Sequence, residues 1–287
     1  MSARNVVLRG AAPQDASLRV LIIPHAGAGA ASGLAFAEHA PAEWLVATVR
    51  LPGRESRIRE SVPDLPGLVA DVVATVRSLP GSGSGPSPGS GPGPGSGPGS
   101  GSGSGPGSGS GSGTAPLIVV GVCSGAVIGL EVVRELLSDG GGRGHSDRVA
   151  GLVVVSQWAV NEKPDPERRL LRDTDDSDQV LDILQEFGGV PASVAANQEM
   201  LQLVLPGIVA DMRAVEDYSS DPDPLLACPL LTVFGDEDQL CPDERTADWS
   251  LFSENTRSAW VPGGHMLLAE NPALLVDALV GNLDQFA

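Results

Sequence analysis

Short apolar runs recur along the chain and alternate with longer segments whose apolar positions follow a helical period. The short runs are rich in Val, Ile and Leu, as in strands that are buried on both faces of a parallel sheet. They lie at 6–9, 18–23, 44–49, 117–120, 148–156, 229–234 and 258–261. The helical patterns fall at 34–40, 65–79, 126–139, 179–187, 197–215 and 273–283. This alternation predicts an α/β fold, with a mostly parallel central sheet flanked by helices.

Two segments interrupt this alternation. Residues 81–113 are only Gly, Ser and Pro, a composition that cannot bury apolar surface and stays disordered. Because the helix before it and the strand after it belong to one βαβ crossover, we interpret it as a loop inserted into a single domain of residues 1–287. The polar stretch from 161 and the two helical patches that follow, up to 218, are predicted to form a lid over the site. An ordinary crossover layer is the alternative.

Composition narrows the function classes. The chain has 18 basic and 36 acidic residues, a net charge of −18, which argues against nucleic acid or an anionic membrane as a partner. No apolar run is long enough to span a membrane, and the first residues lack the apolar core of a signal peptide. The three cysteines are odd in number and lack metal-site spacing, which suits a reducing cytoplasm. We expect a cytoplasmic monomer without a metal or cofactor.

The segment Gly121-Val122-Cys123-Ser124-Gly125 joins the apolar run 117–120 to a helical pattern. A strand that turns sharply into a helix, with a nucleophile between two glycines, is a nucleophile elbow. Cys123 occupies the middle position, where serine is usual. Two alternatives stay open: Cys123 is a small buried hydrophobe, or Ser124 is the nucleophile and Cys123 only packs.

Two further candidates lie just past the ends of predicted strands, at the edge where ligands bind in parallel sheets. Asp238 follows the run 229–234, and His265 follows 258–261. With Cys123 they give the chain order nucleophile, acid, histidine. We therefore predict a triad in which His265 takes the thiol proton and Asp238 orients the imidazole. Asp236, two residues earlier, is the rival acid.

Backbone amides are expected to stabilise the oxyanion of an attacked carbonyl. We assign them to Ser124, directly after the nucleophile, and to Ala26, in the Gly/Ala-rich loop that follows the run 18–23. His25 is interpreted as a residue that shapes this loop, and Cys228 and Cys241 as unreactive.

Several motifs together resemble one family. They are Pro24-His25-Ala26-Gly27-Ala28-Gly29, Leu51-Pro52-Gly53-Arg54-Glu55, Phe187-Gly188-Gly189-Val190-Pro191, Leu205-Pro206 through to Tyr218, Phe234-Gly235-Asp236-Glu237-Asp238 and Gly263-Gly264-His265. In this combination the chain resembles the type II thioesterases of polyketide and non-ribosomal peptide biosynthesis. The resemblance implies an α/β-hydrolase fold with a helical lid. It also implies a substrate that is an acyl group on the phosphopantetheine arm of an acyl or peptidyl carrier protein.

The elbow departs from this family, whose motif reads Gly-His-Ser-Met-Gly. A cysteine nucleophile exchanges one thioester for another at nearly equal energy, which suits acyl transfer to a second carrier or to an amine. We expect hydrolysis through an acyl-Cys123 intermediate, with acyl or aminoacyl transfer as the alternative and a non-catalytic carrier-binding protein as a third hypothesis.

Docking to a carrier by so acidic a protein needs a local basic patch. The candidates are the cluster Arg54, Arg57 and Arg59 and the cluster Arg168, Arg169 and Arg172. A solvated charged face is the alternative interpretation of both.

Overall fold

The computed structural model describes residues 5–79, 114–138, 149–163, 177–186, 190, 192–241 and 243–287. The Gly/Ser/Pro insertion at 81–113, most of the Phe187–Pro191 motif and the cluster Arg168, Arg169 and Arg172 lie outside these residues. Within the described ranges, no helix combines the length and the apolar character that crossing a membrane requires.

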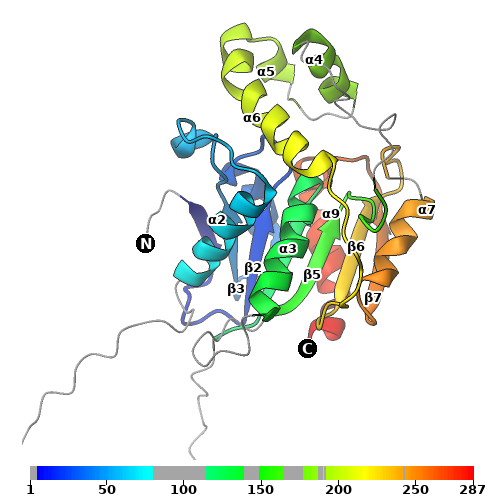
Figure 1. Ribbon diagram of the computed structural model, residues 1–287. Helices are drawn as coiled ribbons and strands as arrows, with labels where there is room; N and C mark the ends of the chain where they lie inside the picture. Colours follow the sequence, from blue (N-terminus) through cyan, green and yellow to red (C-terminus); the bar gives the residue numbers. More distant parts are fainter. Residues whose placement is uncertain are drawn as a thin grey trace, which may run out of the picture.

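The described part of the chain forms one seven-stranded sheet in the order β1-β3-β2-β4-β5-β6-β7 (Figure 1). The strands are β1 (Val6–Gly10), β2 (Leu18–Ile23), β3 (Trp44–Val49), β4 (Leu117–Val122), β5 (Val149–Val155), β6 (Leu230–Gly235) and β7 (Thr256–Val261). β1 pairs with β3 in antiparallel fashion, and the other neighbours are parallel. The predicted α/β fold with a mostly parallel sheet is confirmed, and each strand overlaps a predicted apolar run.

Helices cover both faces of the sheet. They are α1 (Leu34–His39), α2 (Leu65–Ser78), α3 (Ser124–Ser138), α4 (Ser177–Glu186), α5 (Ala192–Ala195), α6 (Gln198–Glu216), α7 (Asp243–Thr246), α8 (Leu267–Glu270) and α9 (Pro272–Val280). The short helices α5, α7 and α8 were not expected, because one helical turn has no periodicity to read.

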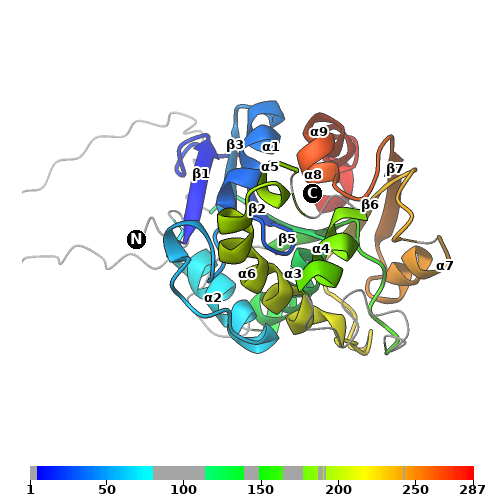
Figure 2. The same ribbon diagram turned by 90° about the horizontal axis from the view of Figure 1, so that it is seen from above.

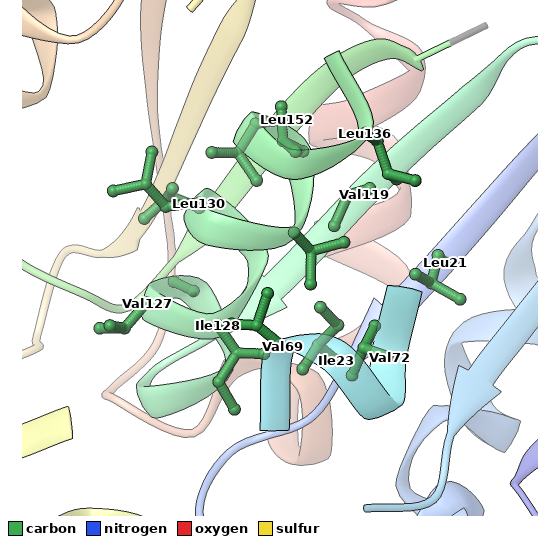
Figure 3. Packing of buried hydrophobic residues seen from close by; sticks show 14 of the residues in the cluster. Leu21, Ile23, Val69, Val72, Val119, Val127, Ile128, Leu130, Leu136 and Leu152 are labelled. Carbon is green, nitrogen blue, oxygen red and sulfur yellow. The ribbon is translucent and has the colours of Figure 1, made fainter. Parts of the chain in front are cut away.

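Side chains that alternate along the strands divide the core into two layers. Leu21 and Ile23 of β2 pack with Val69 and Val72 of α2 on one face, as Figure 3 shows. Their neighbours in β2, such as Ile22, pack on the opposite face with α9. All these side chains are almost completely buried, so the period of two along each strand fixes which helices cover which face.

A third apolar cluster lies above the sheet, in helices α4 and α6 and at Val190 between them. Its buried members are Val180, Leu184, Val190, Leu205, Ile208 and Met212. Figures 1 and 2 show α4, α5 and α6 over one end of the sheet. Ala26, just past the carboxyl end of β2, packs against this cluster. The helical patches predicted for the lid therefore cover the edge of the sheet where the predicted triad lies.

The turn from β4 into α3 is closely packed because its glycines leave no room for a side chain. A Cβ atom on Gly125 would lie 2.2 Å from the carbonyl oxygen of Ile23, and one on Gly121 would lie 2.4 Å from the Cα of Ala126. Both contacts are with backbone, which cannot move aside cheaply. The first turn of α3 thus lies directly against the end of β2.

Gly125→Ala is therefore expected to lower the free energy of unfolding by about 1–3 kcal/mol, the usual cost of forcing atoms into a packed site. Gly129→Ala in the same helix is the matched control, because a Cβ there meets its nearest neighbours at an ordinary 3.5 Å. The control should be neutral or stabilising by up to about 1 kcal/mol, since alanine favours helix. Urea unfolding measures both, and equal effects would contradict this account of the elbow.

Candidate active site

Cys123 sits alone at the bend between β4 and α3. Its φ of 51° lies in the left-handed region, which few non-glycine residues adopt. The amide of Cys123 donates to the carbonyl of Val155 at 2.8 Å, and its carbonyl accepts from Ala126 at 2.8 Å. Cys123 is partly exposed, whereas the next residue, Ser124, is buried. The backbone conformation of the turn therefore leaves Cys123 accessible to a substrate and keeps Ser124 buried.

His265 and Asp238 form a buried pair. His265 Nδ1 lies 2.9 Å from Asp238 Oδ2, and Asp238 Oδ1 accepts from the amide of Leu240 at 2.9 Å. Burial alone would raise the pKa of Asp238, but the hydrogen bond and charge of His265 lower it below its usual value. Asp238 is therefore held as a carboxylate that orients the imidazole.

The imidazole of His265 also contacts the thiol of Cys123. Burial alone would lower the pKa of His265, but hydrogen bonds to Asp238 and Cys123 raise it well above 6.5. One imidazole thus contacts both the predicted nucleophile and the predicted acid.

Asp236, the rival acid, binds a backbone amide instead of the imidazole. Its side chain is exposed, and Oδ1 accepts from the amide of Gly263 at 3.0 Å. Asp236 therefore shapes the turn that leads to His265, while Asp238 contacts the imidazole.

Cys241 belongs to the site, although sequence reasoning set it aside. It is buried, and its thiol hydrogen-bonds with Asp238 and His265. Within the described ranges, one ligand atom each from Asp238, Cys241 and His265 lie within 4.8 Å of one another, the spacing of a possible metal site. Burial raises the pKa of Cys241 to about 12, so the thiol is neutral when no ion is bound, and its hydrogen bonds link it to both members of the Asp238–His265 pair. Nothing in the spacing of the cysteines along the chain signals this contact.

The two predicted oxyanion donors come from neighbouring segments. Ser124 is the first residue of α3, where backbone amides lack acceptors within the helix. Ala26 follows the end of β2, and the close contact of Gly125 with Ile23 and Pro24 brings that end of β2 against the start of α3. Both amides therefore belong to segments that meet beside Cys123.

Most of the first basic cluster is unavailable for docking. Arg54 pairs with Asp211 at 2.6 Å and Arg57 with Asp71 at 2.7 Å, and both arginine side chains are only 6% exposed. Arg59 alone is exposed. The expectation of a docking patch is therefore wrong for Arg54 and Arg57, which hold the loop after β3 in place.

Comparison with known proteins assigns the family. Residues 110–286, more than half of the chain, match the family model described as thioesterase domain. The chain therefore belongs to the thioesterase domain family, a family of hydrolases.

Two curated relatives are thioesterases of Streptomyces. The chain is 28% identical to the probable cadicidin biosynthesis thioesterase of Streptomyces griseus over 269 residues, which cover 92% of this chain and 62% of that protein. It is 26% identical to the thioesterase PikA5 of Streptomyces venezuelae over 82% of this chain and 69% of that one. The chain thus spans less than two thirds of the length of the first relative.

A solved structure supports the fold. The type II thioesterase BorB from the borrelidin biosynthetic cluster superimposes with a TM-score of 0.74 at 21% identity, and the match covers 99% of each chain. The expected α/β-hydrolase fold is thereby confirmed.

The partly buried His25 beside this site predicts that the stability of the protein depends on pH. Burial, with the nearby charges of His265 and Arg54, lowers the pKa of His25 to about 4. In the unfolded chain histidine titrates near 6.5. Between these values only the unfolded chain binds the proton, so stability falls as the pH drops from about 6.5 to about 4. His25 alone accounts for up to about 3 kcal/mol of this loss.

His25→Gln removes that contribution, so its free energy of unfolding should fall less than that of the wild type between about pH 7 and about pH 4.5. His39→Gln, at an exposed position, is the matched control and should follow the wild type. Urea unfolding at both pH values measures the difference. A His25→Gln variant with the wild-type pH dependence would contradict a His25 that is neutral in the folded protein.

Proposed function

We propose that this protein is a type II thioesterase that hydrolyses acyl groups from the phosphopantetheine thioesters of acyl or peptidyl carrier proteins in polyketide or non-ribosomal peptide biosynthesis. The observation that supports it most is the His265 imidazole, which hydrogen-bonds with Asp238 at 2.9 Å and with Cys123. The similarity to the probable cadicidin biosynthesis thioesterase and to the type II thioesterase BorB from the borrelidin biosynthetic cluster supports the choice of substrate class.

In the first step the Cys123 thiolate attacks the thioester carbonyl, after His265 has accepted the thiol proton. The backbone amides of Ser124 and Ala26 stabilise the negative oxygen that forms. Collapse of this intermediate breaks the bond to the phosphopantetheine sulfur, which leaves with the proton from His265. The acyl group is then held on Cys123 as a new thioester.

In the second step water attacks the acyl-Cys123 carbonyl. His265 removes a proton from the water, and Asp238 stabilises the imidazolium that results. The same two amides stabilise the second oxyanion, and its collapse releases the carboxylic acid and the Cys123 thiol, which takes the proton back from His265.

Acyl or aminoacyl transfer is the second candidate, favoured by the cysteine itself. An acyl-cysteine is as energy-rich as the substrate thioester, so a carrier thiol or an amine could replace water at nearly no thermodynamic cost. The chemistry at Cys123 is the same in both cases, and only the acceptor differs.

Cys123→Ala should lower kcat/KM for hydrolysis of an acyl-carrier thioester about 10⁴-fold or more, because loss of the nucleophile leaves only the oxyanion hole and substrate binding. Cys228→Ala is the matched control, since Cys228 belongs to the core and should leave kcat/KM within about threefold of wild type. The released phosphopantetheine thiol is measured with a thiol reagent. Full activity of Cys123→Ala would exclude the mechanism, and would leave Ser124 as the nucleophile to test.

The acceptor is decided by partition of the products. Wild type is mixed with acyl-carrier in water alone, and then with an added unacylated carrier or a primary amine. Free acid formed at the same rate in all mixtures supports hydrolysis. Product on the added acceptor, with little acid formed in water alone, would replace hydrolysis by transfer, and carrier binding without any product would leave a non-catalytic binding protein.

A further inference from the structure

A buried charged contact joins helix α6 of the lid region to the loop that carries Ala26. Asp211 of α6 is 3% exposed. Its Oδ1 lies 2.6 Å from Arg54 Nη2, and its Oδ2 accepts from the amide of Gly27 at 2.8 Å. One carboxylate therefore satisfies two donors that belong to two different loops at the edge of the sheet.

Arg54 extends the same contact to the other side of the Ala26 loop. Its Nη1 donates to the carbonyl of Ala28 at 3.3 Å, and its Nε and Nη2 donate to the carbonyl of Pro52 at 3.2 and 3.0 Å. The loop is thus held at the amide of Gly27 and at the carbonyl of Ala28, by one ion pair.

Apolar packing reinforces this link. Gly27 has a φ of +74°, and a Cβ atom there would lie 2.2 Å from Cγ1 of Ile208, one turn before Asp211 in α6. The methyl group of Ala26 packs against the same apolar cluster, to which Ile208 belongs. The conformation of the Ala26–Gly27 segment and the position of α6 therefore depend on each other.

We propose that Asp211 is a positioning residue, through which the direction of the Ala26 amide in the oxyanion hole depends on the position of α6. The hydrogen bond from Gly27 fixes the peptide unit next to the Ala26 amide, so the direction of that amide depends on Asp211. If α6 moves away, Gly27 loses its acceptor and Arg54 its counter-charge. This inference rests on the proposed function, in which Ala26 donates to the oxyanion.

A matched pair of double variants isolates the acceptor for Gly27. Arg54→Met/Asp211→Asn and Arg54→Met/Asp211→Leu both lack the ion pair, which apolar residues often replace without loss of stability. The asparagine still offers an oxygen to Gly27, and the leucine does not. Glu199→Gln, an exposed acid-to-amide change on the same helix, is the control that should match the wild type.

The leucine double variant should have a kcat for thioester hydrolysis about 10 to 100 times lower than the asparagine double variant, with similar KM, because oxyanion donors act in the transition state. Alkylation of Cys123 by iodoacetamide needs no oxyanion hole and should proceed at the same rate in both. Equal kcat values in the two folded variants would overturn the proposal, and so would a loss of alkylation that parallels the loss of kcat.

Hydrogen exchange gives a second test that needs no thioester. In Arg54→Met/Asp211→Leu, the segment 24–33 should exchange about tenfold faster or more than in Arg54→Met/Asp211→Asn, while α3 exchanges at the same rate in both and shows that the core is intact. Faster exchange in α6 alone, with 24–33 equally protected in the two variants, would overturn the coupling. If the wild type hydrolyses no thioester, the proposed function fails, and the exchange result still decides whether Asp211 holds the loop.

Discussion

The strained turn at Cys123 is the constraint on which the rest of the site depends. A positive φ at a non-glycine residue persists only when the surrounding structure holds it. Here Gly121 and Gly125 carry no side chain, so β4, α3 and the end of β2 approach each other at backbone contact. The same close contact that exposes the thiol also brings Ser124 and the Ala26 loop together. Nucleophile and expected oxyanion donors are therefore products of one packing arrangement.

The electrostatics of the site follow from what surrounds two histidines. His265 has a carboxylate and a sulfur as partners, and its pKa rises despite burial. His25 is partly buried beside that charge and beside Arg54, and its pKa falls to about 4. Of these two histidines, His265, which contacts Cys123, is the one whose surroundings favour the protonated form. Cys241, as a neutral thiol against Asp238, adds a hydrogen bond without adding charge.

Much of this could be predicted from the sequence, because buried strands, the elbow and residues just past strand ends leave local patterns. The seven strands show what the sequence could predict. The contact of His265 with Asp238 rather than with Asp236 shows what it left open. Both aspartates follow the same strand, β6, and only the conformation of the turn decides which one contacts the imidazole. Asp211 gave no local signal, since its role depends on contacts with Gly27 and Arg54, which are distant in the chain. Cys241 gave none either, because its contact with Asp238 depends on the conformation of the loop between them. For the same reason Arg54 and Arg57 resembled a surface patch but are buried.

The most direct test of this account is the intact mass of the protein after brief mixing with an acyl-carrier thioester. We predict a mass increase equal to the acyl group less the hydrogen that it replaces on sulfur, located on Cys123 by peptide mapping and missing from Cys123→Ala. An adduct on Ser124, or turnover by wild type through an adduct that persists unchanged in Cys123→Ala, would contradict it.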